Sequence, residues 1–287
     1  MQQILSSLTP GSLVFDVGAH HGDKAVRFLE RGASVVCIEP LPSARAALKR
    51  RFAGEPRIAI VEKAVADKPG IAELLVNSRD PVLSTLSHRW TEGRFADRVW
   101  DDRAAVEQTT LDALILAHGL PDFVKIDVEG MEHAVLQGLS LQCRALSYEF
   151  TSEFFGDAEA CLLRLEQLGY RAFNLCLGEE DRLALPDWCN RSSLLSHMAE
   201  KGWNAGDSWG DIYAQCQPAP LRLPTPEGEV CLVVGTPSSH GWRDVRLGAG
   251  NPPADEKLAQ EMLDNGHIFD TRLFNRHYLM TARQTTF

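Results

Sequence analysis

The sequence predicts an α/β fold, a three-layer sandwich on a mostly parallel seven-stranded sheet. Short apolar runs alternate with helical patterns along most of the chain, as expected for buried parallel strands and their crossover helices. The first run ends in Asp16, followed by Gly18 and Gly22 ahead of a helical pattern, and the second ends in Glu39. Glycines directly after a strand let the backbone turn tightly beside a ligand. These observations favour a Rossmann-like sheet with a small C-terminal appendage.

The strands and helices are expected as follows. Apolar runs predict strands at 13–17, 35–38, 58–61, 71–76, 123–126, 145–151, 170–177 and 209–214. Apolar residues at helical spacing predict helices at about 23–32, 42–52, 109–119, 131–139 and 157–168. Asp157 is expected to cap the last of these helices.

Residues 77–108 show no periodicity. A long segment without regular structure inside a compact domain is usually functional or mobile. We expect a substrate lid, with plain disorder as the alternative.

Prolines between 218 and 226 indicate a hinge. We therefore divide the chain into a cofactor-binding domain, 1–217, and an appendage, 218–287. The appendage is expected to contain a strand at 230–234 and a helix at 254–263, whose apolar face must pack on the domain or on a second subunit. The appendage could dimerise the protein, which would give a homo-oligomer, or it could cap the substrate site.

The amino-acid composition limits which kinds of partner the protein is expected to bind. The net charge of −10 and pI near 5.4 argue against nucleic acid, whose binding requires clustered Lys and Arg. The seven cysteines form no C-x-x-C pair, which favours reduced thiols and a cytoplasmic location. We expect no membrane span, because no apolar run reaches about 18 residues.

The loop after the first strand indicates the cofactor. A dinucleotide site requires G-x-G-x-x-G, whereas this loop has an acid before its first glycine and His20 in place of the middle glycine. An acid repels a pyrophosphate but suits an ammonium, which S-adenosylmethionine offers together with its sulfonium. Glu39 lies 23 positions after Asp16, near the offset at which such folds place a ribose-binding acid. Small apolar residues after the third strand suit an adenine ring, or simply end a core strand. The predicted cofactor-binding residues are Asp16, Gly18, Ala19, His20, Gly22, Asp23, Glu39, Pro40, Ala64, Val65 and Asp127.

A second block, residues 125–132, ends a strand in two alternating acids. Asp127 and Glu129 should face the same crevice as the first loop, because ligands bind outside the carboxyl ends of parallel strands. A reaction that removes a proton from a substrate in this crevice would need a general base. The candidates are Glu129, His133, Glu149 and His88.

Rival roles exist for these side chains. Glu129 and His133, four residues apart, could share one side of the helix start, or His133 could be a solvated helix residue. Glu129 could instead cap the helix through first-turn amides. A divalent metal on Asp127, Glu129 and Glu132 is an alternative use of the acids. We predict no metal.

The loop after the first strand, with Asp16, Gly18 and Gly22, and the block at residues 125–132 resemble the FkbM-type family of S-adenosylmethionine-dependent methyltransferases. The resemblance covers roughly residues 10–215. The resemblance implies methyl transfer, usually to a hydroxyl of a sugar, glycolipid or natural product. It assigns Asp16, Gly18 and Gly22 to the cofactor loop and Glu39 to the ribose, and it places Asp127 and Glu129 beside the transfer site. The sequence departs from the family pattern at His20–His21, and the segment after Pro218 has no counterpart in it.

The leading hypothesis is therefore an O-methyltransferase with a small-molecule or glycosylated hydroxyl acceptor. A nicotinamide-dependent oxidoreductase and a catalytically silent cofactor-binding or assembly protein are the alternatives.

Overall fold

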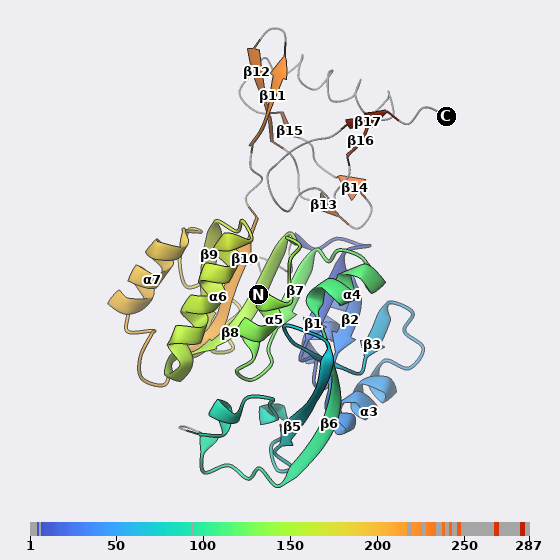
Figure 1. The fold of residues 1–287 in the computed structure, drawn as a ribbon, viewed down its shortest axis with the longest axis vertical. Helices are drawn as coiled ribbons and strands as arrows, with labels where there is room; N and C mark the ends of the chain where they lie inside the picture. Colours follow the sequence, from blue (N-terminus) through green and yellow to red (C-terminus); the bar gives the residue numbers. More distant parts are fainter. Residues whose placement is uncertain are drawn as a thin grey trace.

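The main domain is built on a seven-stranded sheet (Figure 1). The computed structural model describes residue 5, residues 7–92 and 95–216, and the backbone of short strands between 220 and 284. The strand order is β3-β2-β1-β7-β8-β10-β9, and β10 runs antiparallel to both of its neighbours while the other pairs are parallel. The strands are β1 (Leu13–Val17), β2 (Ser34–Ile38), β3 (Ile58–Val61), β7 (Phe123–Ile126), β8 (Ala145–Thr151), β9 (Ala172–Leu177) and β10 (Trp209–Gln215).

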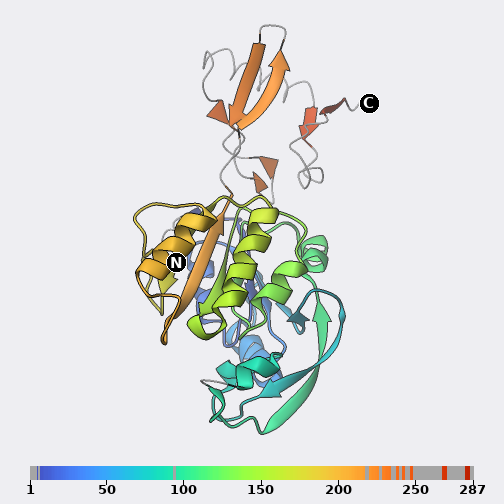
Figure 2. The ribbon, with the colours of Figure 1, turned by 60° about the vertical axis from the view of Figure 1, so that its left-hand side comes forward.

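Helices cover both faces of this sheet and complete the predicted three layers. One core lies under α4 (Leu111–His118), α5 (Glu132–Gln137), α6 (Phe155–Gln167) and α7 (Arg191–Glu200). Figure 2 shows the last three side by side over the sheet. The other core lies under α2 (Asp23–Glu30) and α3 (Pro42–Arg51). Because helices cover both faces of the sheet, most of its strands, such as β1 and β2, are apolar along nearly their whole length, which is why the sequence predicts them well.

The strand order reverses between β1 and β7, and the loops after these strands meet there. Gly18 adopts φ +79°, and a Cβ at this position would lie 1.7 Å from the carbonyl oxygen of Asp127. Only glycine allows this approach. The crevice between two such loops is where parallel α/β sheets bind their ligands.

A second sheet corrects the prediction for residues 77–108. β6 (Asp102–Thr109) pairs with β5 (Gly70–Val76) and with β4 (Ala64–Val65). Short 3₁₀ turns, η1 (Pro81–Leu83) and η2 (His88–Thr91), occupy part of the connection. In β6 only Val106 is buried, so its sequence carries almost no apolar alternation. This ribbon, lowest in Figure 1, packs against the start of α3.

The sequence analysis missed α7 and misplaced one cap. The Asn190 side chain accepts a hydrogen bond from the Ser193 amide, and Leu194 and Met198 are buried four residues apart, a signal that could have predicted α7. Helix α6 begins at Phe155 without a side-chain cap. Asp157 lies in its first turn and pairs with Arg89 instead.

The described strands after Pro218 are short. β11 (Pro220–Thr225), β12 (Gly228–Val233) and β15 (Arg246–Leu247) form one small sheet, so a strand lies near the predicted 230–234. β13 (Pro237–Ser238) pairs with β14 (Gly241–Trp242), and β16 (His267–Phe269) pairs with β17 (Ala282–Gln284). The predicted helix 254–263 lies outside the described residues. Among the residues that are described, no helix is long and apolar enough to cross a membrane.

Candidate functional site

A pocket of about 450 Å³ opens at the carboxyl ends of β1, β2 and β7. Ten of the eleven predicted cofactor-binding residues line it, and the exception is Gly22. A Cβ on Gly22 would lie 2.5 Å from Cε2 of Phe52, so this glycine lets the loop pack against the end of α3. Of the four base candidates only Glu129 lines this pocket, whereas His88, His133 and Glu149 do not.

Glu39 is fixed at the lip of the pocket by two backbone amides. Its Oε2 accepts the His20 N–H at 2.8 Å, and its Oε1 accepts the Leu41 N–H at 2.7 Å. Burial raises the pKa of this carboxyl to about 7, against the lowering effect of the two amides. Each oxygen keeps a lone pair, so the carboxylate can accept further hydrogen bonds from a ligand.

Asp16 lies deeper on the same side and is buried without a partner. Its side chain is 1 % exposed, and neither carboxylate oxygen has a hydrogen-bond partner within the described part of the chain. Burial raises its pKa to about 6, although the Lys125 ammonium opposes that shift. Buried polar groups are normally hydrogen-bonded, so an unpartnered carboxylate beside a pocket points to a ligand.

His20 lies in the loop between β1 and α2. Its φ of +46° is left-handed, a conformation that non-glycine residues adopt rarely and mostly at functional sites. Its ring stacks on His21 at 3.8 Å, and its Nε2 is buried without a partner in the described region. Burial and the neighbouring His21 lower the pKa of His20, so the ring stays neutral near pH 7.

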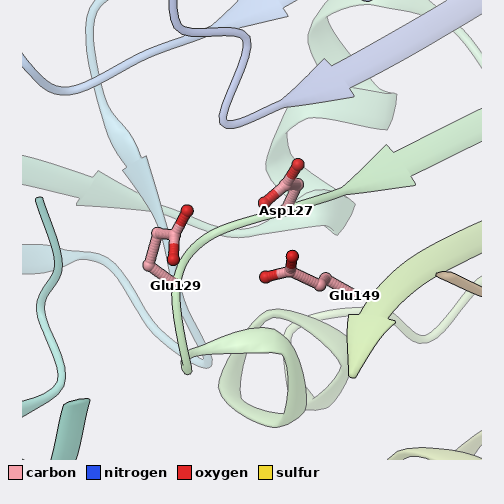
Figure 3. A group of neighbouring side chains, drawn as sticks. All are labelled: Asp127, Glu129 and Glu149. Carbon is pink, nitrogen blue, oxygen red and sulfur yellow. The ribbon is translucent and has the colours of Figure 1, made fainter. Parts of the chain in front are cut away.

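Three carboxylates converge at the carboxyl ends of β7 and β8, and two of them, Asp127 and Glu129, line the pocket. Asp127 and Glu129 come from the loop after β7, and Glu149 comes from β8 (Figure 3). One oxygen from each lies within 4.8 Å of the others. Glu129 has φ +56°, the second left-handed non-glycine residue of the described chain, and it also lines the pocket. We refer to Asp127, Glu129 and Glu149 as the acid trio.

Charges within the acid trio repel each other. Burial, followed by the charge of Asp127, raises the pKa values of Glu129 and Glu149 well above the usual range. The buried Lys125 ammonium lies 2.6 Å from Asp127 Oδ2. Burial lowers the pKa of Lys125, but Asp127 and Asp16 outweigh it and raise the value overall. The acid trio therefore contains one carboxylate, Asp127, that pairs with an ammonium, and two glutamates whose charged forms are disfavoured.

Glu132 does not join the acid trio, which corrects the rival metal-ligand set and the capping alternative for Glu129. Its carboxylate accepts the amide N–H groups of Val128 at 3.0 Å and Gly130 at 3.1 Å. Glu132 is thus the acid that satisfies the amides before α5. Glu129 lies before the helix, has a left-handed backbone and lines the pocket.

Neither histidine candidate reaches the acid trio. His88 is exposed on η2. His133 lies inside α5, where its ring meets Gln137 at 3.5 Å. The i, i+4 pairing expected between Glu129 and His133 fails because Glu129 is not helical. His133 thus matches the alternative of a helix residue without a catalytic contact.

The sequence analysis gave no role to three residues that the fold brings to the acid trio. Asp211 faces Glu149 across the β8–β10 pair, and burial raises its pKa. Lys125 pairs with Asp127, and Thr85 contacts the backbone of Glu129. The register of β10 and the path of the loop after β5 cannot be read from local sequence. The position of Lys125 two residues before Asp127 was the one available signal.

Comparison with known proteins agrees with this geometry. The sequence profile of the methyltransferase FkbM domain matches residues 16–172. A curated relative, the 2-O-methyltransferase NoeI of Sinorhizobium fredii (strain NBRC 101917 / NGR234), is 28% identical over 149 residues. That match covers 48% of this chain and 61% of the relative, so the chain spans less than two thirds of its length.

Solved structures of two other methyltransferases are similar at low identity. The precorrin-6y C5,15-methyltransferase of Geobacter metallireducens GS-15 is 11% identical with a TM-score of 0.39, covering 75% of this chain and 87% of that one. An rRNA methylase of Streptococcus thermophilus is 10% identical with a TM-score of 0.37, covering 75% and 93%.

The fold is a Rossmann-like sheet with a pocket at the point where its strand order reverses. Because the profile matches more than half of its residues, the chain belongs to the FkbM methyltransferase family.

Proposed function

We propose that the protein is an S-adenosylmethionine-dependent O-methyltransferase whose acceptor is a hydroxyl of a sugar, glycolipid or natural product. Family membership supports methyl transfer. The printed name of the relative NoeI, a 2-O-methyltransferase, favours oxygen as the acceptor atom.

The observation that carries the cofactor assignment is the pair of buried acids Asp16 and Glu39 in one pocket. The unpartnered Asp16 carboxylate suits the ammonium of the methionine part. Glu39, held by two amides, suits the ribose hydroxyls. Ala64 and Val65 add a small apolar wall for the adenine. The residues present therefore fit the cofactor.

The acid trio, two of whose members line the pocket, supports the proton-transfer role. The bound cofactor supplies a methyl group on a sulfonium, so this chain has to orient the acceptor and remove the hydroxyl proton. Burial and the charge of Asp127 raise the pKa values of Glu129 and Glu149, which increases the affinity of both glutamates for a proton. One carboxylate of this pair can accept the acceptor's proton, and the other can hydrogen-bond the acceptor hydroxyl. We assign the general base to Glu129, which lines the pocket.

Methyl transfer from radiolabelled S-adenosylmethionine to a panel of methyl glycosides tests this proposal. We expect Glu129→Gln to lower turnover by about 10²-fold or more, because a positioned base contributes about that much. Affinity for S-adenosylhomocysteine should stay within about threefold, since Glu129 does not bind the cofactor's charged groups. Glu159→Gln, at an exposed position on α6, is the matched control. Loss of S-adenosylhomocysteine binding in Glu129→Gln would contradict the assignment.

Two other readings predict different ligands. A nicotinamide-dependent oxidoreductase should be stabilised against heat by NAD, and a silent binding protein should bind S-adenosylhomocysteine but methylate no glycoside. We expect a rise in melting temperature with S-adenosylhomocysteine and none with NAD, because Asp16 repels a pyrophosphate.

We also propose that residues 218–287 form an appendage that dimerises the protein or caps the acceptor site. Among the described strands, those after Pro218 pair only with one another and with no strand of the main sheet, which supports a separate unit. Light scattering on a chain ending at Gln217 tests the oligomeric role. A change from two chains per particle to one supports dimerisation, and an unchanged number of chains per particle contradicts it.

A further inference from the structure

The loop that carries Glu129 is held from outside the main sheet. Thr85, on the segment between β5 and β6, donates its hydroxyl hydrogen to the Glu129 carbonyl oxygen at 2.6 Å. The same hydroxyl oxygen accepts the Ser87 amide at 2.8 Å. Thr85 is 1 % exposed and lines the pocket. Both sides of its hydroxyl are therefore occupied.

Thr85 is itself anchored to the ribbon. Its amide and carbonyl form two hydrogen bonds with Leu75 of β5, at 3.0 and 2.8 Å. A buried side chain with a doubly bonded backbone has little freedom to follow a moving partner. The contact thus joins the loop after β7 to a separate sheet, across 44 residues of sequence.

A second contact holds the next residue of this loop. Gly130 has φ +93°, and a Cβ there would lie 2.9 Å from Cε3 of the buried Trp90. Trp90 stacks on Phe154, near the start of α6. The loop therefore contacts both the Thr85 hydroxyl and the Trp90 ring, while Glu132 accepts hydrogen bonds from its amides.

We propose that Thr85 is the positioning residue that keeps Glu129 in its left-handed conformation, so that the Glu129 carboxylate stays beside Asp127 and Glu149. A non-glycine residue at positive φ costs free energy of its own and persists only when its surroundings hold it. A hydrogen bond to the carbonyl of that residue is a direct restraint on its ψ. This inference rests on the proposed function for its catalytic meaning and on the contacts alone for its structural meaning.

The prediction concerns how the acid trio titrates. Several charged groups face Glu129 from the loop after β7, from β7 and β8, and from the segment before η1; they are Asp127, Glu132, Lys125, Glu149 and Asp80. When Glu129 leaves this environment, the repulsion that couples it to Glu149 falls. Both glutamates should then titrate nearer the usual range for a glutamate.

The experiment is a carboxyl ¹³C NMR titration of the full chain labelled at glutamate, with Glu129→Gln and Glu149→Gln used for assignment. In the wild type, these two resonances should titrate above the usual range for a glutamate. In Thr85→Val, which keeps the shape but loses the hydroxyl, they should move down by about one pH unit or more. Thr85→Ser should restore the wild-type titration. Thr91→Val, which removes another hydroxyl-to-carbonyl bond of the same segment, should leave it unchanged.

Each outcome decides the proposal. A Thr85→Val titration equal to that of the wild type, or a Thr85→Ser titration as low as that of Thr85→Val, overturns it. If Thr85→Val does not fold, Thr85→Cys retains a weak donor and should titrate between wild type and the ordinary value. Equal titrations in wild type, Thr85→Ser and Thr85→Cys would overturn the proposal in that case.

Two further readouts separate this inference from the proposed function. Calorimetry with S-adenosylhomocysteine on the same samples should give equal affinities for wild type and Thr85→Val. On an accepted methyl glycoside, kcat should fall by about tenfold or more in Thr85→Val with little change in KM for the cofactor. If the wild type binds no S-adenosylhomocysteine, the proposed function is wrong. The carboxyl titration still tests whether Thr85 positions Glu129, because it does not depend on cofactor binding.

Discussion

The two sides of the pocket are built in different ways. On the proposed cofactor side, Asp16 lies in β1 and Glu39 follows the neighbouring β2, and the backbone amides of His20 and Leu41 hold Glu39. On the proposed acceptor side, Glu129 follows β7, Glu149 lies in β8, and a third segment supplies Thr85. One side is thus encoded locally and the other is assembled from distant parts of the chain.

This difference indicates where specificity can change. The acceptor side depends on the segment between β5 and β6, which contributes several pocket-lining residues, among them Pro81, Val82 and Ser84. Loops held by a rigid scaffold are where binding preferences are usually set.

The largest effect is expected where the two sides touch. Gly18→Ala would place a Cβ 1.7 Å from the Asp127 carbonyl oxygen, so both loops must move apart. We expect the free energy of unfolding in urea to fall by about 3 kcal/mol or more, together with loss of S-adenosylhomocysteine binding. Gly54→Ala is the control, because Gly54 also has positive φ but nothing within 4 Å of its Cβ. It should cost only about 1 kcal/mol, and equal costs would mean that backbone strain, not the contact, dominates.

Asp16→Asn should separate stability from binding on the cofactor side. The folded protein raises the pKa of Asp16 to about 6, so the ionised carboxylate destabilises the ligand-free protein above that pH. We expect the variant to be more stable at pH near 8 by about 1–2 kcal/mol, while the advantage disappears near pH 4, where the carboxyl is protonated. Its affinity for S-adenosylhomocysteine should nevertheless fall. A variant that is less stable than the wild type at both pH values would contradict this account.

The pH dependence of binding should be of similar origin and smaller. Asp16 and Glu39, with pKa values raised to about 6 and about 7, must lose their protons before they can pair with an ammonium and accept from ribose hydroxyls. Affinity for S-adenosylhomocysteine should therefore rise by about tenfold from pH near 5 to pH near 8. Asp16→Asn should flatten part of this rise. A flat wild-type profile measured by calorimetry would count against both assignments.

Chelation should have the smallest effect. The acid trio has oxygen ligands within 4.8 Å of one another, but the Lys125 ammonium already pairs with one of them. We expect methyl transfer to survive exhaustive treatment with EDTA. If activity is lost on chelation and returns with Mg²⁺, these acids are metal ligands and the expectation is wrong.

The same contrast explains what the sequence could predict. Apolar runs predicted all seven strands of the main sheet, because helices cover both faces of the sheet. The glycines and acids after β1 and β2 predicted residues that line the pocket. Strand β6 was missed because only Val106 among its residues is buried. Glu132 was misread because its role depends on the amides that it faces after folding, and Thr85 carries no local signal at all.

The most direct test is calorimetric titration of S-adenosylhomocysteine into Glu39→Gln and Glu129→Gln side by side. If the two sides divide the work as proposed, Glu39→Gln should weaken binding by about tenfold or more, because a charged acceptor of hydrogen bonds is lost. Glu129→Gln should bind as the wild type does, within about threefold. Equal losses in the two variants, or no loss in Glu39→Gln, would contradict the division of the pocket into a cofactor side and an acceptor side.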